Sequence, residues 1–344
     1  MSPASIIYRR RRYDFDESLA DGLDLMQAGA IEMAAILACS EPSAVEVNEP
    51  LQLGGLPRTA LAVGTARILR LLRRRDIRIV TYAIENSGVL DRPPPHRLKG
   101  RVRRRLEHAL SRFVARSIDS VAFGTYASQL NYASALAVEL STSAKSLIPC
   151  LPVACDCAQV EPRRADSVIF VGALVERKGL RTLLAAWPAV VGAHPAATLT
   201  IVGKGALESL VSAFTAVNPS CHVLIDPPRR DIHRLLRTSV AVVLLSQPLR
   251  GWREQVGLPI VEGLAHGCTV IASGETGLAD WLADHGHSIL PPDAEPAELS
   301  RVILEVLSDA RAASAILRDL PSVDGRIQAD RWLFEDEPRP STAP

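Results

Sequence analysis

The feature that most constrains the fold is a regular alternation of short apolar runs with helix-length amphipathic stretches. This alternation is typical of parallel βα units, in which each apolar run is a buried strand and each amphipathic stretch is a helix that covers it. In the first half, strands are expected at residues 5–8, 44–48, 77–84, 120–124 and 145–149. Helices are expected between them, at residues 17–38, 57–75, 97–116 and 126–141.

The same alternation returns after an aperiodic stretch, "CLPVACDCAQVEPRRAD", which contains two prolines and is interpreted as a linker. Further strands are expected at residues 167–172, 197–203, 221–226, 240–245, 268–273 and 287–290. A chain of 344 residues is long enough for two domains. The prediction is an α/β protein with two Rossmann-like domains of parallel sheet, at residues 1–150 and 151–320, followed by a tail at 321–344 in which Trp332, Leu333 and Phe334 contact the body.

Cysteine usage argues against a metal site or a disulfide framework. The close pair Cys155 and Cys157 has neither a second pair nor a histidine cluster beside it in the sequence. The other cysteines are scattered along the chain. No run of about 18 apolar residues and no signal-peptide pattern occurs, so a cytoplasmic location is expected.

Arginines are concentrated in the first half. Residues 58–116 hold 16 Lys and Arg against 4 Asp and Glu, although the net charge of the chain is only +1. The ordinary interpretation is a pair of helices with arginines in water and apolar residues on the sheet, since apolar residues share one arc. That arc contains Ile68, Leu69, Leu71 and Leu72 in the first helix, and Leu98, Val102, Leu106, Leu110 and Phe113 in the second.

A second interpretation of the Arg-rich residues 67–116 is an anionic membrane surface. Each Lys or Arg near an anionic leaflet is worth about 1 kcal/mol. Nucleic acid is not expected as a partner, because no nucleic-acid-binding motif accompanies the charge.

The stretch "FVGALVERKGL" is the first candidate binding element. An apolar strand ends at Gly172, and Lys178 precedes the next helix. Helix N-terminal amides together with a lysine at a strand-to-helix turn form an anion site, for which a phosphate is the expected ligand. The alternative is that Lys178 is a solvated loop lysine.

The stretch "EQVGLPIVEGLAHG" is the second, and it places Glu254 and Glu262 on either side of a helix start. Pro259 suits the first helical position, and Gly257 permits close backbone approach to a ligand. In one continuous helix the two carboxylates would lie about 12 Å apart along the axis, too far to share a proton. They can instead bind two ends of a long ligand whose anionic middle lies at the helix N-terminus. The alternative is one glutamate favoured by the helix dipole and one surface glutamate.

Taken in order, these stretches resemble the retaining group 1 (family 4) glycosyltransferases of the two-domain GT-B fold. The motifs stand here as "VGALVERKGL", "IVGKG" and "EQVGLPIVEGLAHGCTVIAS". The resemblance is close over residues 167 to about 310 and loose over 40–150. It implies two parallel-sheet domains that face a cleft.

The resemblance also implies residue roles. Glu254 and Lys178 would be the catalytic pair, with Glu254 beside the donor sugar and Lys178 neutralising the diphosphate. Glu262 would bind the ribose hydroxyls, and the loop of Gly257 and Leu258 would offer backbone amides. The implied donor is a nucleotide-diphosphate sugar, transferred with retention and with no metal or other cofactor, because cationic groups and a helix end stabilise the leaving diphosphate.

The sequence departs from the family pattern at several positions. The arginine usual after the glycine at position 172 is Ala173 here, and Arg177 is expected to supply a guanidinium instead. The first domain lacks the usual glycine-rich loop after its first strand. It also lacks the usual histidine after the strand at residues 77–84, where Glu85 and Asn86 become the acceptor-side candidates. The alternative for these two is a polar exit from the strand.

The predicted function is therefore transfer of a sugar to a glycan or lipid-linked acceptor in glycan biosynthesis, in the cytoplasm or peripherally on the inner face of the membrane. A second hypothesis is a weak or inactive GT-B protein that binds a nucleotide sugar as a partner subunit, motivated by Ala173 and the reduced first domain. A third is a GT-B sugar epimerase, which the Gly-Leu-Pro motif and its flanking glutamates disfavour.

Overall fold

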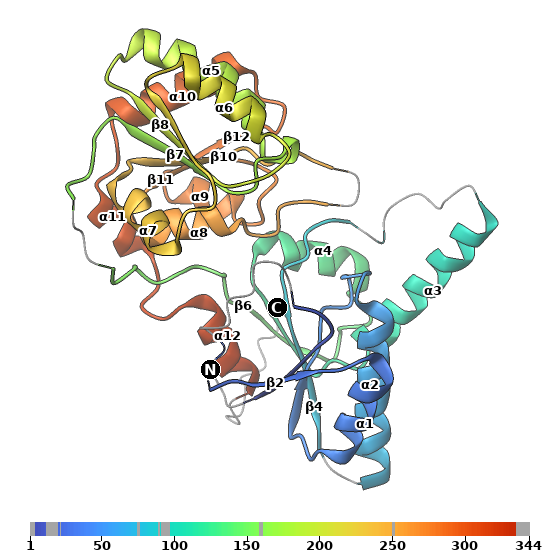
Figure 1. Cartoon of the computed structure of the whole chain (residues 1–344). Helices are drawn as coiled ribbons and strands as arrows, with labels where there is room; N and C mark the ends of the chain where they lie inside the picture. The colour runs from blue at the N-terminus through green and yellow to red at the C-terminus, as the bar shows by residue number, and fades with distance from the viewer. Residues whose placement is uncertain are drawn as a thin grey trace. The chain divides into compact units, whose positions relative to one another are not determined.

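The computed structural model describes residues 4–11, 20, 22–73, 76–88, 90, 97–157, 161–249 and 252–334. The chain divides into two compact units (Figure 1). The first contains residues 1–124, 128–148 and 326–344, and the second contains residues 125–127 and 149–325. The chain therefore leaves the first unit after Ile148 and returns to it at Arg326.

The second unit is built on one six-stranded parallel sheet in the order β12-β11-β10-β7-β8-β9. This confirms the six strands expected in this half. The strands are β7 (Ser167–Val171), β8 (Thr198–Val202), β9 (Cys221–Leu224), β10 (Ala241–Leu244), β11 (Thr269–Ser273) and β12 (Ser288–Leu290). The chain builds outward from β7 in one direction and then from β10 in the other, so these adjacent strands form the switch point where ligands of such sheets bind.

Helices cover both faces of this sheet, which explains why its strands are almost entirely apolar. In Figure 1, α5, α6 and α10 lie over one face, and α7, α8, α9 and α11 lie over the other. The helices on the first face are α5 (Leu180–Ala193), α6 (Glu208–Val217) and α10 (Pro296–Ser308); on the second they are α7 (Arg229–Thr238), α8 (Leu258–Ala265), α9 (Ala279–Asp284) and α11 (Ala313–Asp319). Trp187 of α5 is fully buried against this core.

The first unit has a four-stranded parallel sheet in the order β3-β4-β5-β6. Its strands are β3 (Ala44–Glu46), β4 (Arg78–Ala83), β5 (Ser120–Phe123) and β6 (Ala144–Leu147), and its helices include α1 (Ala30–Cys39), α2 (Leu56–Arg73), α3 (Leu98–Ala115) and α4 (Tyr126–Leu136). Alternate strand residues face opposite sides. Ile79 and Val121 pack in the core with α2 and α3, whereas Val80 and Ala122 pack against the C-terminal helix α12 (Gly325–Phe334).

One expectation for this unit was wrong. The helix expected at residues 17–38 is helical only from Ala30, because Asp24–Gln27 forms strand β2, which pairs in parallel with β1 (Ser5–Tyr8) in a separate two-stranded sheet. Residues 17–19 and 21 of that expected helix lie outside the described residues. The contact expected of Trp332, Leu333 and Phe334 is confirmed, because α12 buries Ala329 and Leu333 against the first unit and the other two residues pack on the same cluster.

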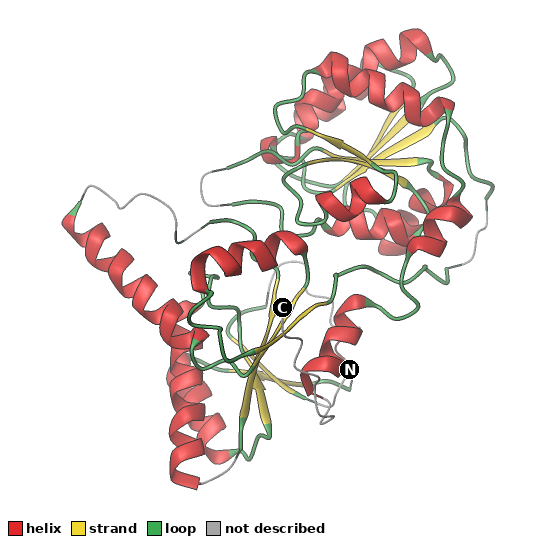
Figure 2. Cartoon of the chain, turned by 180° about the vertical axis from the view of Figure 1, so that it is seen from behind, coloured by secondary structure: helices red, strands yellow, loops and turns green. Residues whose placement is uncertain are grey.

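The ordinary interpretation expected the apolar arcs of both Arg-rich helices to face the sheet. The structure shows that only part of each arc does so. In α2, Leu69 is buried, but Ile68, Leu71 and Leu72 are exposed. In α3, Leu110 and Phe113 pack on the core, whereas Leu98, Val102 and Leu106 are exposed. The reason for α3 is visible in Figures 1 and 2, where its N-terminal half extends beyond the sheet.

Among the described residues, no helix combines the length and the apolar character needed to cross a bilayer.

Candidate functional site

Glycines bring three strand ends together at the switch point of the second unit. Gly203, after β8, has φ +151°, and a Cβ atom on it would lie 1.8 Å from the carbonyl oxygen of Gly172, after β7. Gly179, between the short 3-10 helix η2 (Glu176–Lys178) and α5, has φ +68°. A Cβ there would lie 2.2 Å from the carbonyl oxygen of Leu245, after β10. The turn that carries Lys178 therefore packs directly on the end of β10.

A buried ion pair lies at this position. Lys178 Nζ donates to Glu254 Oε2, and the two residues are 8% and 9% exposed. Ser246, at the end of β10, donates its hydroxyl to the same Glu254 oxygen at 2.7 Å. Burial lowers the pKa of Lys178, and the carboxylate of Glu254 opposes that shift. The structure therefore brings together Lys178 and Glu254, the two residues predicted to be catalytic.

The Trp252 ring lies beside this pair, and the sequence analysis did not select this residue. The Arg177 guanidinium carbon lies 4.1 Å from the Trp252 ring centroid, and Lys178 Nζ lies 5.5 Å from it. Such cation–π contacts hold two positive charges beside one aromatic ring. The signal in the sequence was "WRE", an aromatic residue two positions before Glu254. The guanidinium that was expected to replace the one missing at Ala173 thus lies next to Lys178.

The helix break predicted in "GLP" is present. Helix α8 begins at Leu258, which is exposed, with Gly257 as its N-cap at φ +86° and Pro259 in its first turn. Gly263 lets α8 approach β10, since a Cβ on it would lie 2.4 Å from Val242 Cγ1. Glu254 accordingly lies in the loop before α8, and Glu262 lies within α8.

Glu262 has a partner that the sequence did not reveal. Arg229, in the first turn of α7, donates to Glu262 Oε1 at 2.5 Å. The Arg229 side chain is 65% exposed, so this pair adds little to stability. It places a cation beside Glu262, and a ligand hydroxyl at Glu262 can share that carboxylate with Arg229.

The acceptor-side candidates lie in the first unit, after β4. The Glu85 carboxylate accepts bonds from the backbone and hydroxyl of Ser87, at 2.8 and 2.5 Å, and Asn86 is buried. Asn131 of α4 donates to the Glu85 carbonyl at 2.8 Å. In this structure both candidates belong to a hydrogen-bonded loop at the carboxyl edge of the sheet.

Glu49 is a buried carboxyl at the same edge that the sequence analysis did not select. Its Oε2 accepts hydrogen bonds from the backbone of Ile84 and Glu85 and from the Tyr132 hydroxyl, at 3.1, 3.0 and 2.9 Å. Burial raises its pKa to about 7, more than these hydrogen bonds lower it. Its signal was an acidic residue directly after the expected strand at 44–48, where parallel sheets place functional groups.

This pKa predicts a pH-dependent stability. The folded state holds the Glu49 proton up to about pH 7 and the unfolded state releases it near 4.5, so stability contributed by this group falls between these values, by on the order of 3 kcal/mol. A Glu49→Gln variant lacks the titration. Its thermal midpoint is expected to match that of the wild type near pH 5 and to exceed it at pH 8. Parallel pH profiles for the two proteins would contradict the assignment.

Residues 165–309 match the family model described as "Glycosyl transferases group 1". A GDP-mannose-dependent monoacylated alpha-(1-6)-phosphatidylinositol monomannoside mannosyltransferase of Corynebacterium glutamicum is 30% identical over 168 residues, which are 47% of this chain and 42% of that protein. A phosphatidyl-myo-inositol mannosyltransferase of Mycolicibacterium smegmatis is 30% identical over 149 residues, 43% of this chain and 38% of that protein. The matched segments thus span about two-fifths of these relatives.

Solved structures share the fold over most of the chain. The structure of Anabaena HepE in complex with UDP superposes with a TM-score of 0.61 at 16% identity, covering 92% of this chain and 84% of that one. At this identity the likeness shows the fold alone, which is the GT-B fold of two parallel-sheet α/β units.

Proposed function

We propose that the protein transfers a sugar from a nucleotide-diphosphate sugar to a glycan or lipid-linked acceptor, with retention of anomeric configuration, because residues 165–309 match the family model of the group 1 glycosyl transferases. The observation that carries the proposal is the buried Lys178–Glu254 pair at the switch point of the sheet, beside the N-terminus of α8. Both residues stand at the motif positions that the family resemblance assigns to donor chemistry.

The donor diphosphate is placed at Lys178 and the α8 N-terminus. An ammonium has three N–H donors, so its bond to Glu254 leaves donors for phosphate oxygens. The backbone after Gly257 adds amides and the positive end of a helix dipole. Arg177 adds a second cation near Lys178. Together these groups stabilise the charge that develops on the leaving diphosphate, and the proposal requires no divalent metal for that step.

The two carboxylates take the ends of the donor. Glu254, held in one orientation by Lys178 and Ser246, accepts hydrogen bonds from sugar hydroxyls. Glu262 accepts them from the ribose, and the exposed Arg229 beside it also borders the nucleoside position. The backbones of Gly172 and Leu258 supply the remaining proposed contacts to the donor.

Calorimetric titration with UDP-, GDP- and ADP-sugars, followed by measurement of nucleoside diphosphate release with glycan and lipid acceptors, tests the proposal. Tight binding of one donor and release of its diphosphate with a new glycosidic product is the expected result. Release of an isomerised sugar without acceptor would identify an epimerase instead. Absence of both binding and turnover across the donors would reject the proposed site.

Ala173 favours one alternative function, a nucleotide-sugar-binding partner subunit of low activity. Alanine cannot supply the guanidinium usual at this position, and the loss of one charge-assisted bond of about 1.5–3 kcal/mol slows a reaction by roughly ten- to a hundredfold. Binding of a nucleotide sugar without turnover would support this alternative. Restoration of turnover by Ala173→Arg would trace the low activity to this residue.

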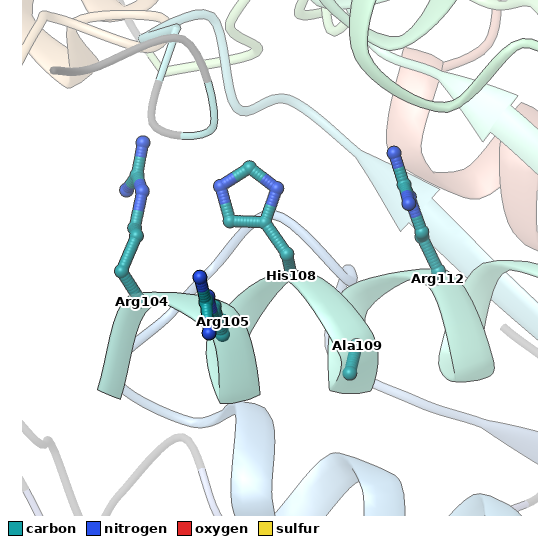
Figure 3. Close-up of a pocket in the computed structure, with 5 residues that line it drawn as sticks. All are labelled: Arg104, Arg105, His108, Ala109 and Arg112. Carbon is teal, nitrogen blue, oxygen red and sulfur yellow. The ribbon is translucent and has the colours of Figure 1, made fainter. Parts of the chain in front are cut away.

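The Arg-rich helices support a peripheral location on an anionic, cytoplasmic membrane face. Arg104, His108 and Arg112 follow one another along one side of α3, as Figure 3 shows, in a depression whose lining residues all belong to that helix. The exposed Leu98, Val102 and Leu106 lie on the same helix. Cationic and apolar side chains on one exposed helix are the two components of interfacial binding. The phosphatidylinositol acceptors named for the relatives are consistent with it.

Vesicle binding is expected to depend on these apolar residues. The triple variant Leu98→Ser, Val102→Ser, Leu106→Ser should lose most of the binding to phosphatidylglycerol vesicles in a flotation assay, and wild-type binding should weaken as salt is raised. A matched control is Val217→Ser, an exposed apolar residue at the end of α6 in the other unit. Equal binding of the wild type to neutral phosphatidylcholine vesicles would contradict an electrostatic surface.

A further inference from the structure

A second cluster of reactive side chains lies in the C-terminal unit, and it includes neither Lys178 nor Glu254. Cys155 and Cys157 lie on the segment that leads toward β7, His233 lies on α7, and His266 directly follows α8. One potential ligand atom from each of the four residues lies within 4.8 Å of all the others. Two thiols and two imidazoles are therefore gathered around one point.

The spacing within the cluster fits a tetrahedral ion. Zinc–sulfur bonds of about 2.3 Å and zinc–nitrogen bonds of about 2.0–2.1 Å place neighbouring ligand atoms about 3.3–3.8 Å apart. Cys155 Sγ lies 3.5 Å from His233 Nδ1, within that range. The His233 and His266 rings meet edge to face with centroids 4.8 Å apart. The widest separation in the cluster requires a local contraction of only about 1 Å to reach this geometry.

The histidines are oriented as ligands are. His266 Nδ1 lies 2.6 Å from the carbonyl oxygen of Glu262, which assigns its proton to Nδ1 and leaves the Nε2 lone pair available. Nε2 of His266 is buried and has no hydrogen-bond partner among the described residues, and His233 faces Cys155 Sγ through Nδ1. Buried polar atoms are almost always paired, and metal-bound histidines usually donate their other ring N–H to a carbonyl or carboxylate.

The cysteine segment is held in place by groups outside the cluster. Arg237 Nη2 donates to the carbonyl oxygens of Cys155 and Cys157, at 2.7 and 2.9 Å, and lies 3.1 Å from Cys157 Sγ. The Cys155 N–H donates to the Ala265 carbonyl at 2.8 Å. The Arg237 guanidinium and the Ala265 carbonyl therefore fix the backbone of the segment that carries both thiols.

We propose that Cys155, Cys157, His233 and His266 bind one zinc ion in a closed, structural Cys₂His₂ site. Four protein ligands leave no open position for catalysis, and mixed thiolate and imidazole ligands select zinc over harder cations. The ion fixes the entry segment of the second unit to α7 and to the end of α8. The spacing in the sequence disfavoured a metal site, because no histidine lies near the Cys pair in the chain. The fold brings His233 and His266 to that pair.

Metal analysis of the full chain tests the proposal. After expression in zinc-supplemented medium and purification without chelator, mass spectrometry is expected to find about one zinc per chain. Cys157→Ser and His266→Gln should each lower bound zinc severalfold, and the double variant should hold less than about a tenth of an equivalent. Cys39→Ser and His222→Gln, at exposed positions away from the cluster, are matched controls and should keep the wild-type zinc content.

Cobalt substitution keeps the test decisive if a ligand variant fails to fold. Cobalt added to the metal-depleted wild type should give the intense visible bands of a tetrahedral ion and thiolate charge-transfer absorption, and zinc should displace both. Metal removal should also lower the thermal midpoint. Equal zinc in the wild type and the double variant, or a Cys155–Cys157 disulfide in protein purified under reducing conditions, would overturn the proposal.

Discussion

Lys178→Ala is expected to lower kcat/KM for sugar transfer by at least about tenfold and up to about a hundredfold. Under the proposed function, the variant loses a charge-assisted bond of about 1.5–3 kcal/mol to the leaving diphosphate. It also leaves the Glu254 carboxylate buried beside Ser246 without the ammonium that neutralises it. Both effects raise the energy of the transition state. Negative charge develops on the diphosphate where the cation has been removed, and the unpaired Glu254 carboxylate lies beside that charge.

Binding measurements separate this catalytic role from a structural one. Lys178→Ala should raise the Kd for the nucleoside diphosphate much more than the Kd for the corresponding nucleoside, since only the former carries phosphates. Arg301→Ala, which removes a cation from an exposed i,i+4 pair on α10, is the control and should leave both values unchanged. An equal loss of affinity for nucleoside and nucleoside diphosphate would assign Lys178 to the folding of the site alone.

Gly203→Ala is expected to destabilise the second unit by more than about 3 kcal/mol. The new Cβ would lie 1.8 Å from the Gly172 carbonyl oxygen, at a φ of +151° that L-residues rarely adopt. The clash is with the backbone of the neighbouring strand end, so no side-chain rotation relieves it. A large drop in the urea midpoint of unfolding, or loss of soluble protein, is the expected result.

Gly192→Ala in α5 of the same unit is the matched control. A Cβ at Gly192 meets nothing within 4 Å, and alanine in a helix is favoured over glycine by roughly 0.5–1 kcal/mol. This variant should therefore unfold at a slightly higher urea concentration than the wild type. Similar midpoints for Gly203→Ala and Gly192→Ala would show that β7 and β8 can separate at their ends.

The strands of the second unit could be predicted because each is buried on both faces. Ala241–Leu244 and Thr269–Ser273 are fully buried in the structure, and such strands are short apolar runs that need no partner to be recognised. The short strand Asp24–Gln27 carries no such signal. Two of its four residues are exposed and it exists through its pairing with β1, so local periodicity assigned it to a helix.

The candidate site divides in the same way. Residue type and spacing are local signals, and they were sufficient to select Lys178, Glu254 and the helix start after Gly257 from the sequence. Ser246, Trp252 and Arg229 are partners brought in by neighbouring segments, and Glu49 owes its raised pKa to its burial in the first unit. No spacing in the sequence encodes such contacts.

By itself the sequence determined the order of βα units, the helix break between Glu254 and Glu262, and the glycines at strand ends, because these depend on burial patterns and backbone freedom within a few residues. The tertiary structure alone decided that Lys178 and Glu254, 76 positions apart, neutralise each other, and that two histidines meet Cys155 and Cys157. Strand order is the physical reason. It makes β10 the neighbour of β7, and the packing of α7 on α8 then brings together residues that the chain keeps far apart.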